Sequence, residues 1–228
     1  MSRARFQLGT VVSHPFEENT YLAHLEGRND CLIFDPGFEP HKIFEYLDER
    51  KLTPAAILCT HGHGDHIGGN ADMKERWPDC PLMIGAGDAE FLTDPILNMS
   101  AMLGLELISP PADRLLLPGE KLNLAGFELE IREIPGHSPG HIVFVWHATE
   151  AKQDQPTIVF GGDVLFQRSI GRTDFPYGSF EQLRDGIHQK LFDLPDDTIV
   201  LPGHGSATTI GEEKESNPFV GLHADFSP

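Results

Sequence analysis

The feature that most restricts how this chain folds is a histidine-rich run at residues 61–66, which reads His-Gly-His-Gly-Asp-His. Imidazole and carboxylate side chains are the ligands that zinc, iron and manganese bind in proteins. The interleaved glycines let the backbone turn tightly, so neighbouring side chains can converge on one point. A histidine tag is the alternative, but the glycines and the internal position disfavour it. The run therefore predicts a metal site in a loop that follows a strand.

Three further segments carry the same residue types, and each also follows a predicted strand. Taken singly, a Gly-His-Gly is usually a turn with an exposed histidine, and a Gly-Gly-Asp is often only a turn or a helix cap. Together with residues 61–66 they supply seven ligands, enough for two ions about 3.5–4 Å apart. The three segments are Gly136-His137-Ser138-Pro139-Gly140-His141, Gly161-Gly162-Asp163 and Gly203-His204-Gly205.

The spacing within the first run suggests how it divides between two ions. His61 and His63 are two residues apart, so their side chains point the same way if the backbone is extended. Asp65 and His66 are adjacent and are expected to diverge. That arrangement suits a second ion beside the first.

The pattern along the chain predicts two halves, each running from strands to a helix and back to strands. Strands in the middle with helices outside favour a layered α/β sandwich over a doubly wound parallel sheet. The length fits one domain over residues 1–228. In the first half we expect strands 6–12, 20–25, 31–34, 55–59 and 82–84, and helices 41–51, 68–77 and 87–92. In the second half we expect strands 114–117, 121–124, 127–131, 142–146, 157–160 and 198–201, and a helix 179–191.

Residues 94–113 contain three prolines and no clear period, and we expect a long, partly helical excursion there. Its apolar residues leave two interpretations open: a lid over a cleft, or ordinary core packing. The residues concerned are Ile96, Leu97, Met99, Met102 and Leu103.

Charge and cysteine content exclude several classes of partner. The formal net charge of −18 disfavours nucleic acid and anionic membranes as partners, because both would repel the chain. No apolar run approaches the length of a membrane span, and no signal peptide is expected at the N-terminus. The odd count of three cysteines argues against a disulfide framework. A reducing, cytoplasmic location is therefore expected.

The order of the metal-ligand segments resembles that of the metallo-β-lactamase fold superfamily. The likeness rests on His-Xaa-His-Xaa-Asp-His after a strand, followed by His137, Asp163 and His204, and it covers nearly the whole chain. It implies a single-domain αβ/βα four-layer sandwich with metals at the edge where two sheets meet. Other matching segments are Asn19-Thr20-Tyr21, Asp35-Pro36-Gly37 and Asn217-Pro218-Phe219.

The resemblance also implies a role for each ligand. His61, His63 and His137 would bind the first ion, Asp65, His66 and His204 would bind the second, and Asp163 would bridge the two ions. In a one-ion form, Asp65 would instead orient its neighbours or act as a base. The expected cofactors are two divalent ions, with zinc first and iron or manganese as alternatives. β-Lactamases of this fold usually use a cysteine or lack the last aspartate–histidine pair, so lactam hydrolysis is not expected.

Within the superfamily, two segments are similar to the glyoxalase II group of thioester hydrolases, in particular its short bacterial branch. They are Gly161-Gly162-Asp163-Val164-Leu165-Phe166 and Ile170-Gly171-Arg172-Thr173-Asp174-Phe175. The implied reaction is attack of hydroxide on a small-molecule thioester such as S-lactoylglutathione. Long glyoxalase II proteins have a C-terminal helical domain that helps to bind glutathione. No matching segment is found here, so the acyl group and the thiol carrier stay open.

Arg172 is the candidate for binding a substrate carboxylate, since its planar fork suits bidentate pairing. The alternative is a structural salt bridge to Asp163 or Asp174. His141 is expected only to hydrogen-bond within its own loop.

Two other functions remain open on the sequence. A persulfide dioxygenase of the same fold would use one iron, held here by His63, His137 and Asp163. A non-catalytic metal-binding scaffold would be expected to lack ligands, and none of the seven is missing. His204 in its Gly-His-Gly context favours the hydrolase.

Overall fold

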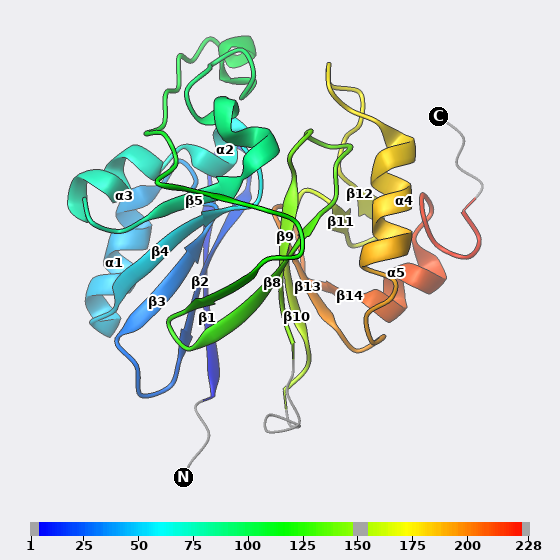
Figure 1. Cartoon of the computed structure of the whole chain (residues 1–228), viewed down its shortest axis with the longest axis horizontal. Coiled ribbons are helices and arrows are strands. Elements are labelled where there is room, and N and C mark those ends of the chain that lie inside the picture. The colour runs from blue at the N-terminus through cyan, green and yellow to red at the C-terminus, as the bar shows by residue number, and fades with distance from the viewer. Residues whose placement is uncertain (1–4, 148–154, 225–228) are drawn as a thin grey trace.

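Two six-stranded β-sheets face each other at the centre of the molecule, with helices on both outer sides (Figure 1). The structure is a computed structural model that describes residues 5–147 and 155–224. The strand order is β1-β2-β3-β4-β5-β6 in the first sheet and β14-β13-β10-β9-β8-β7 in the second. Helices α1 and α3 cover the first sheet, and α4 and α5 cover the second (Figure 1). The predicted αβ/βα sandwich is therefore confirmed.

The first sheet runs from an antiparallel edge to a parallel one. Its first three strands form an antiparallel meander, since β1 pairs with β2 and β2 with β3 in that sense. From β3 to β6 every pairing is parallel. The elements of this half are β1 Phe6–Ser13, β2 Glu18–Leu25, β3 Asp30–Phe34, α1 Pro40–Arg50, β4 Thr53–Cys59, α2 Gly64–Ile67, α3 Asn70–Arg76, β5 Leu82–Gly85, the 3-10 helices η1 Ala86–Leu92 and η2 Ser100–Leu103, and β6 Arg114–Leu116.

The second sheet is antiparallel apart from one pair, β10 with β13. A short hairpin, β11 with β12, lies outside both sheets. The elements of this half are β7 Lys121–Leu124, β8 Phe127–Glu133, β9 Ile142–Trp146, β10 Ile158–Gly162, β11 Leu165–Phe166, β12 Ser169–Ile170, α4 Phe180–Lys190, β13 Ile199–Pro202, β14 Thr208–Thr209 and α5 Ile210–Ser216.

The side-chain alternation of β3 shows how the four layers form. Leu32 and Phe34 point into the core between the sheets, whereas Cys31 and Ile33 point into the core beneath α1 and α3. Both faces are buried because successive residues of a strand point to opposite sides. Phe34 stacks on Phe160 of the second sheet, with ring centroids 3.7 Å apart. Burying an aromatic or branched side chain of this size contributes about 1.5–3 kcal/mol, so the facing sheets hold together largely through such contacts.

Two sequence predictions about these elements were wrong in detail. The strand predicted at 114–117 was assigned to the second half, but β6 pairs with β5 and closes the first sheet. The helix predicted at 87–92 is a 3-10 helix, η1. The helix predicted at 68–77 is present as α3, whereas the short helix α2 was not predicted. Local periodicity leaves such details ambiguous.

The excursion at 94–113 contains one short 3-10 helix and otherwise irregular chain. Its apolar side chains are largely exposed, at 75% for Ile96, 77% for Met102 and 52% for Leu103. Core packing is therefore the wrong interpretation for these three residues. The segment touches the histidine-rich loop, because Gly64 N donates a hydrogen bond of 2.8 Å to Asn98 O.

The two longest described helices, α1 and α4, have 11 residues each. None of the helices in the described part of the chain has the length and apolar character needed to cross a membrane.

Candidate metal centre

All seven predicted ligand residues lie together where β4, β8, β10 and β13 end. Because the carboxyl ends of parallel strands meet at one sheet edge, loops that are distant in sequence converge there. The ligand atoms form three overlapping groups, each spanning no more than 4.8 Å. We call His61, His63 and His137 the histidine triad, and Asp65, His66 and His204 the mixed triad. The third group joins His61 and His66 to Asp163.

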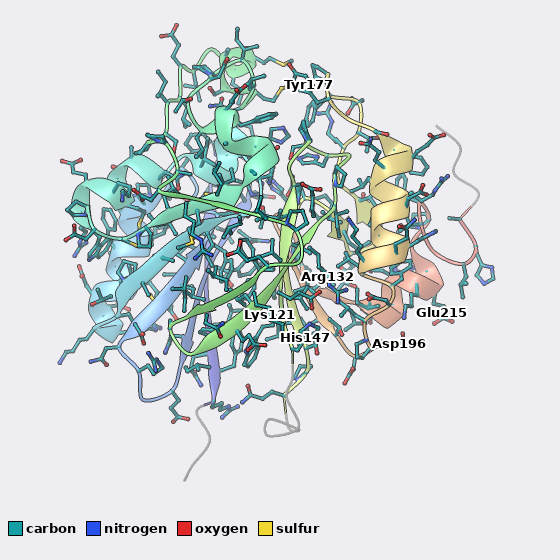
Figure 2. All side chains as sticks on the ribbon, viewed as in Figure 1. Lys121, Arg132, His147, Tyr177, Asp196 and Glu215 are labelled. Carbon is teal, nitrogen blue, oxygen red and sulfur yellow. The ribbon has the colours of Figure 1, made fainter. Side chains whose placement is uncertain are left out.

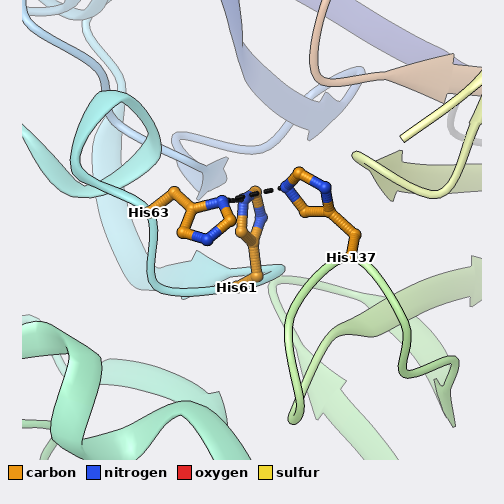
Figure 3. Close-up of side chains that lie close together, drawn as sticks. All are labelled: His61, His63 and His137. Atoms are coloured by element: carbon orange, nitrogen blue, oxygen red, sulfur yellow. Dashed lines mark hydrogen bonds between the residues drawn. The ribbon is translucent and has the colours of Figure 1, made fainter. Parts of the chain in front are cut away.

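The histidine triad brings two loops together (Figure 3). Nδ1 of His63 lies 3.1 Å from Nε2 of His61 and 2.9 Å from Nε2 of His137. All three side chains are buried, with His63 the most exposed at 6%. Nδ1 of His63 thus lies within hydrogen-bond distance of a ring nitrogen of each of the other two histidines.

The mixed triad is more open. Nε2 of His204 lies 3.3 Å from Nε2 of His66 and 3.3 Å from Oδ2 of Asp65. His66 is fully buried, whereas the side chains of Asp65 and His204 are 21% and 27% exposed. Asp65 and His66 were expected to diverge, yet Oδ2 of Asp65 and Nε2 of His66 are only 3.9 Å apart. The first turn of α2 aims both at one point.

Asp163 lies between the triads. Its Oδ1 is 3.4 Å from Nε2 of His66, and its Oδ2 is 3.5 Å from Nε2 of both His137 and His204. The loop that carries His204 needs glycine at Gly203, because a Cβ there would collide with Asp163 and His66. This placement suits the bridging role predicted for Asp163.

Hydrogen bonds on the outer side of four rings fix their tautomers. In each case Nδ1 faces an acceptor and donates its hydrogen outward, which leaves a lone pair on Nε2 in the neutral ring. Thr60 acts as the acceptor for His61 because its own hydroxyl hydrogen goes to Asp35. The acceptors are Thr60 Oγ1 for His61 at 3.1 Å, Asp35 Oδ2 for His66 at 3.2 Å, Arg172 O for His137 at 2.9 Å and Phe16 O for His204 at 3.0 Å.

Those lone pairs all face the centre of the cluster. In the neutral form that binds a metal, His66 and His204 have no hydrogen to place between their Nε2 atoms, which are 3.3 Å apart. Likewise Nδ1 of His63 can share a hydrogen with only one of its two neighbours. A cation would accept all of these lone pairs at once. The side chains therefore fit a divalent metal ion.

Burial and neighbouring charges shift the pKa values of the histidines in opposite directions in the two triads. Burial lowers the pKa of His63 to about 3, with His137 adding to the shift. Burial also lowers the pKa values of His61 and His137. For His66 the effect of burial is outweighed by the carboxylates of Asp163 and Asp65, and its pKa is raised well above the ordinary value.

The other two members of the mixed triad show the same balance of charge. Burial acts to lower the pKa of His204, but the hydrogen bond to Asp65 and the charge of Asp163 raise it overall. Burial acts to raise the pKa of Asp65, and the neighbouring His66 and His204 lower it overall. The histidine triad is thus a set of neutral donors, and the mixed triad is a set of paired charges.

The side chain of Arg172 lies outside the cluster. Its guanidinium makes a bidentate ion pair with Asp174, with distances of 2.9 and 2.7 Å, and lies 4.5 Å from the ring centroid of Phe175. Of the two salt bridges considered from the sequence, the structure has the one to Asp174. The backbone carbonyl of Arg172 is what touches the site, as the acceptor for His137.

Three supporting residues were not among the site residues predicted from the sequence. Asp35 accepts hydrogen bonds from the backbone N and the hydroxyl of Thr60 and also touches His66. Asp88 lies behind the histidine triad. His141, expected to bond within its own loop, instead accepts a hydrogen bond of 3.0 Å from the backbone N of Asp163. The position of Asp35, after a strand and before Pro-Gly, is a sequence signal that could have identified it. No such sequence signal marks Asp88.

Aromatic side chains flank the histidine triad on its open side. The ring of Phe175 lies 5.3 Å from that of His63 and 5.8 Å from that of His137. Phe91 lies 6.2 Å from His63 and 6.1 Å from Tyr177. Tyr177 is 54% exposed and lies at the rim, between the segment that carries η2 and the loop before α4 (Figure 2).

Known proteins resemble this chain over most of its length. It is 44% identical over 207 residues to the probable metallo-hydrolase YqgX of Bacillus subtilis, which covers 90% of this chain and 93% of that protein. It is 39% identical over 208 residues to the hydroxyacylglutathione hydrolase GloC of Haemophilus influenzae, with the same two coverages.

Solved structures of other proteins also resemble this chain in fold. The BLEG-1 B3 metallo-beta-lactamase has a TM-score of 0.86 at 36% identity, covering 94% of this chain and 99% of that one. TTHA1623 in a di-iron-bound form has a TM-score of 0.78 at 34% identity, covering 92% and 99%. ETHE1 from Myxococcus xanthus has a TM-score of 0.77 at 26% identity, covering 97% and 86%.

The family follows from the sequence profile, the fold and the clustered side chains together. The profile of the metallo-beta-lactamase superfamily matches residues 15–204, which contain every residue of both triads and Asp163. Proteins of this fold bind divalent metals, and the histidine and aspartate groups found here can hold them. This chain belongs to the metallo-beta-lactamase superfamily and is one of its metallo-hydrolases.

Proposed function

We propose that this chain is a thioester hydrolase of the glyoxalase II type, acting on a small-molecule hydroxyacyl thioester at a centre of two divalent ions. The observation that carries the proposal is the mixed triad. His204 approaches Asp65 and His66 within 3.3 Å, so a second set of ligands stands beside the histidine triad. The 39% identity to the hydroxyacylglutathione hydrolase GloC supports the substrate class.

Two divalent ions held by these residues supply a hydroxide nucleophile at neutral pH and polarise a carbonyl oxygen. In this proposal His61, His63 and His137 hold one ion, Asp65, His66 and His204 hold the other, and Asp163 reaches both. Zinc is the ion proposed first, and iron or manganese also suits this donor set.

The chain's own groups orient the reaction. The outer hydrogen bonds of His61, His66, His137 and His204 prevent their rings from turning, so the donor atoms stay aimed inward. Asp65 is ionised, because His66 and His204 lower its pKa, and it therefore serves as a ligand and orienting carboxylate rather than an acid. A thiolate, whose thiol has a pKa of about 8.5, leaves with little help from an acid.

The partly exposed Phe175 and Tyr177 offer apolar surface for the part of the substrate that lies outside the metal cluster. Arg172 is proposed to bind a substrate carboxylate only by exchanging its present partner Asp174. Neither nucleic acid nor membrane is proposed as a partner, given the net charge of −18.

Two measurements on the purified protein test the proposal: metal content by elemental analysis, and turnover of a thioester panel with and without air. We expect two equivalents of metal and hydrolysis of S-lactoylglutathione or a related hydroxyacyl thioester at equal rates in both atmospheres. A single tightly held iron with oxygen uptake on glutathione persulfide would overturn the proposal in favour of a dioxygenase. A β-lactam belongs in the panel because of the likeness to BLEG-1, and preferential lactam cleavage would also overturn it.

A further inference from the structure

A buried carboxylate outside the ligand set connects the two loops of the histidine triad. Asp88 lies in η1, directly after β5, and is 0% exposed. Its Oδ2 accepts a hydrogen bond of 3.1 Å from Gly62 N and one of 2.6 Å from Ser138 Oγ. Its Oδ1 accepts one of 2.6 Å from Gly140 N.

The donors are immediate neighbours of the triad in sequence. Gly62 separates His61 from His63, and Ser138 follows His137. The two histidines lie in different loops, His63 after β4 and His137 before β9, and are 74 residues apart in sequence. One carboxylate therefore ties together two loops that also meet through their imidazoles and through a hydrogen bond of 2.9 Å from Ile142 N to Thr60 O.

The surrounding backbone is packed too closely for this junction to move freely. A Cβ at Gly140 would collide with the backbone of Gly87 and with Asp88 N, so the η1 segment and the loop that carries His137 are in direct contact. Phe91, also in η1, packs against Gly62 from the same side. The three segments form one close-packed unit with Asp88 at its centre.

The mixed triad has a different support. Asp35, at the end of β3, contacts His66 and Thr60. Each triad thus has a buried carboxylate next to it: Asp88 contacts the loops of the histidine triad, and Asp35 contacts His66 of the mixed triad. A buried carboxylate with three donors is costly to disturb, because each donor would be left without a partner.

We propose that Asp88 is a positioning residue for the histidine triad: its carboxylate ties the loop of His61 and His63 to the loop of His137 at the spacing that one shared ion requires. The proposal rests on the two-ion centre put forward above. Supporting residues of this kind typically change metal affinity by roughly 10–100-fold.

Cobalt titration of the full-length protein tests this, with absorbance and elemental analysis as readouts. Asp88→Asn keeps the shape of the side chain but turns one acceptor into a donor that faces an N–H or O–H group. We expect about a 10–100-fold weaker affinity for one of the two equivalents, restored when the cobalt concentration is raised by the same factor. The control Asp79→Asn, at an exposed aspartate before β5, is expected to leave both affinities unchanged.

A double variant identifies which ion is affected. If Asp88 acts through the histidine triad alone, adding Asp88→Asn to His63→Ala causes no further loss, because the affected ion is already absent. Added to His204→Ala, the same substitution should weaken the binding of the ion that remains by about 10–100-fold. Wild-type affinity for both ions in Asp88→Asn, or a further loss on top of His63→Ala, would overturn the proposal.

Ser138→Ala provides a second route should Asp88→Asn fail to fold. It removes one of three donors and should weaken the same ion by a smaller factor; unchanged affinity in this variant counts against the proposal. A wild-type protein with a single ion would instead contradict the two-ion centre. The role of Asp88 would then be decided by whether Asp88→Asn weakens that ion as His63→Ala does.

Discussion

The two triads stand side by side in one cluster but differ in chemistry and in access to solvent. The histidine triad consists of three buried imidazoles, each with a pKa below the ordinary value. The mixed triad contains a carboxylate, its two imidazoles have raised pKa values, and two of its three side chains are partly exposed. One half of the centre is thus a closed set of neutral donors, and the other is an open set of opposite charges.

The difference assigns separate tasks to the two halves. A closed, neutral set binds a cation without first having to break ion pairs, so the histidine triad is suited to hold its ion permanently. The mixed triad must exchange internal ion pairs for metal contacts, and it faces solvent. We therefore expect its ion to exchange faster and to lie closer to the substrate.

Asp163→Ala should have the largest effect, because Asp163 lies between the two triads and close to both. Both ions should bind more weakly, and kcat/KM for the thioester should fall by about 1,000-fold, which corresponds to roughly 4 kcal/mol of transition-state stabilisation. Steady-state kinetics and elemental analysis on one preparation check this. Asp185→Ala, at an exposed helix position, is the control. Loss of only one ion would show that Asp163 serves a single triad.

His63→Ala and His204→Ala should separate the halves. Each is expected to lower the metal content from two equivalents to about one and the activity by about 100-fold or more. After brief chelation, His63→Ala should lose its remaining ion sooner than His204→Ala, because it retains only the open mixed triad. Equal rates of metal loss in the two variants would remove the distinction between a closed and an open half.

Asp35→Asn should weaken metal binding at the mixed triad, as Asp88→Asn is expected to weaken it at the histidine triad. Asp35 is 3% exposed and holds both His66 and Thr60. We expect about a 10–100-fold loss of metal affinity at the mixed triad, and a smaller one at His61 through Thr60. Cobalt titration in the His63→Ala background isolates the mixed triad. If the substitution weakened only the histidine triad, the division of supports between Asp35 and Asp88 would be wrong.

Phe175→Ala should have the smallest effect. The ring lies beside the histidine triad and is not a ligand, so its removal should raise KM by about 5–10-fold, in line with roughly 1–1.5 kcal/mol for an aromatic contact, and leave kcat and metal content nearly unchanged. Phe175→Leu should show a smaller rise in KM. A fall in kcat at constant KM would place this ring in the reaction step instead of in substrate binding.

Much of the site was predictable because its ligands are carried by short, distinctive segments. The run at 61–66 and the later His137, Asp163 and His204 could be identified by residue type and glycine context, and the structure places all seven within overlapping groups. Their roles as ligands remain predictions.

Other features could not be predicted, because they depend on contacts between distant segments. β6 looks like the first strand of the second half, and only its pairing with β5 places it in the first sheet. The short helix α2, inside the histidine-rich run, was not expected from the sequence. The exposure of Ile96 and Met102 runs against their apolar character, which by itself favours burial.

The sequence by itself determined the chemistry of the centre, because imidazole and carboxylate groups bind metal wherever a fold brings them together. The tertiary structure alone decided how those groups divide into a closed triad and an open one. It also decided that Asp88, which no local pattern marks, stands behind the histidine triad with three donors. The physical reason is that ligand type is a property of single residues, whereas burial, tautomer and hydrogen-bond support arise only when loops from different strands meet.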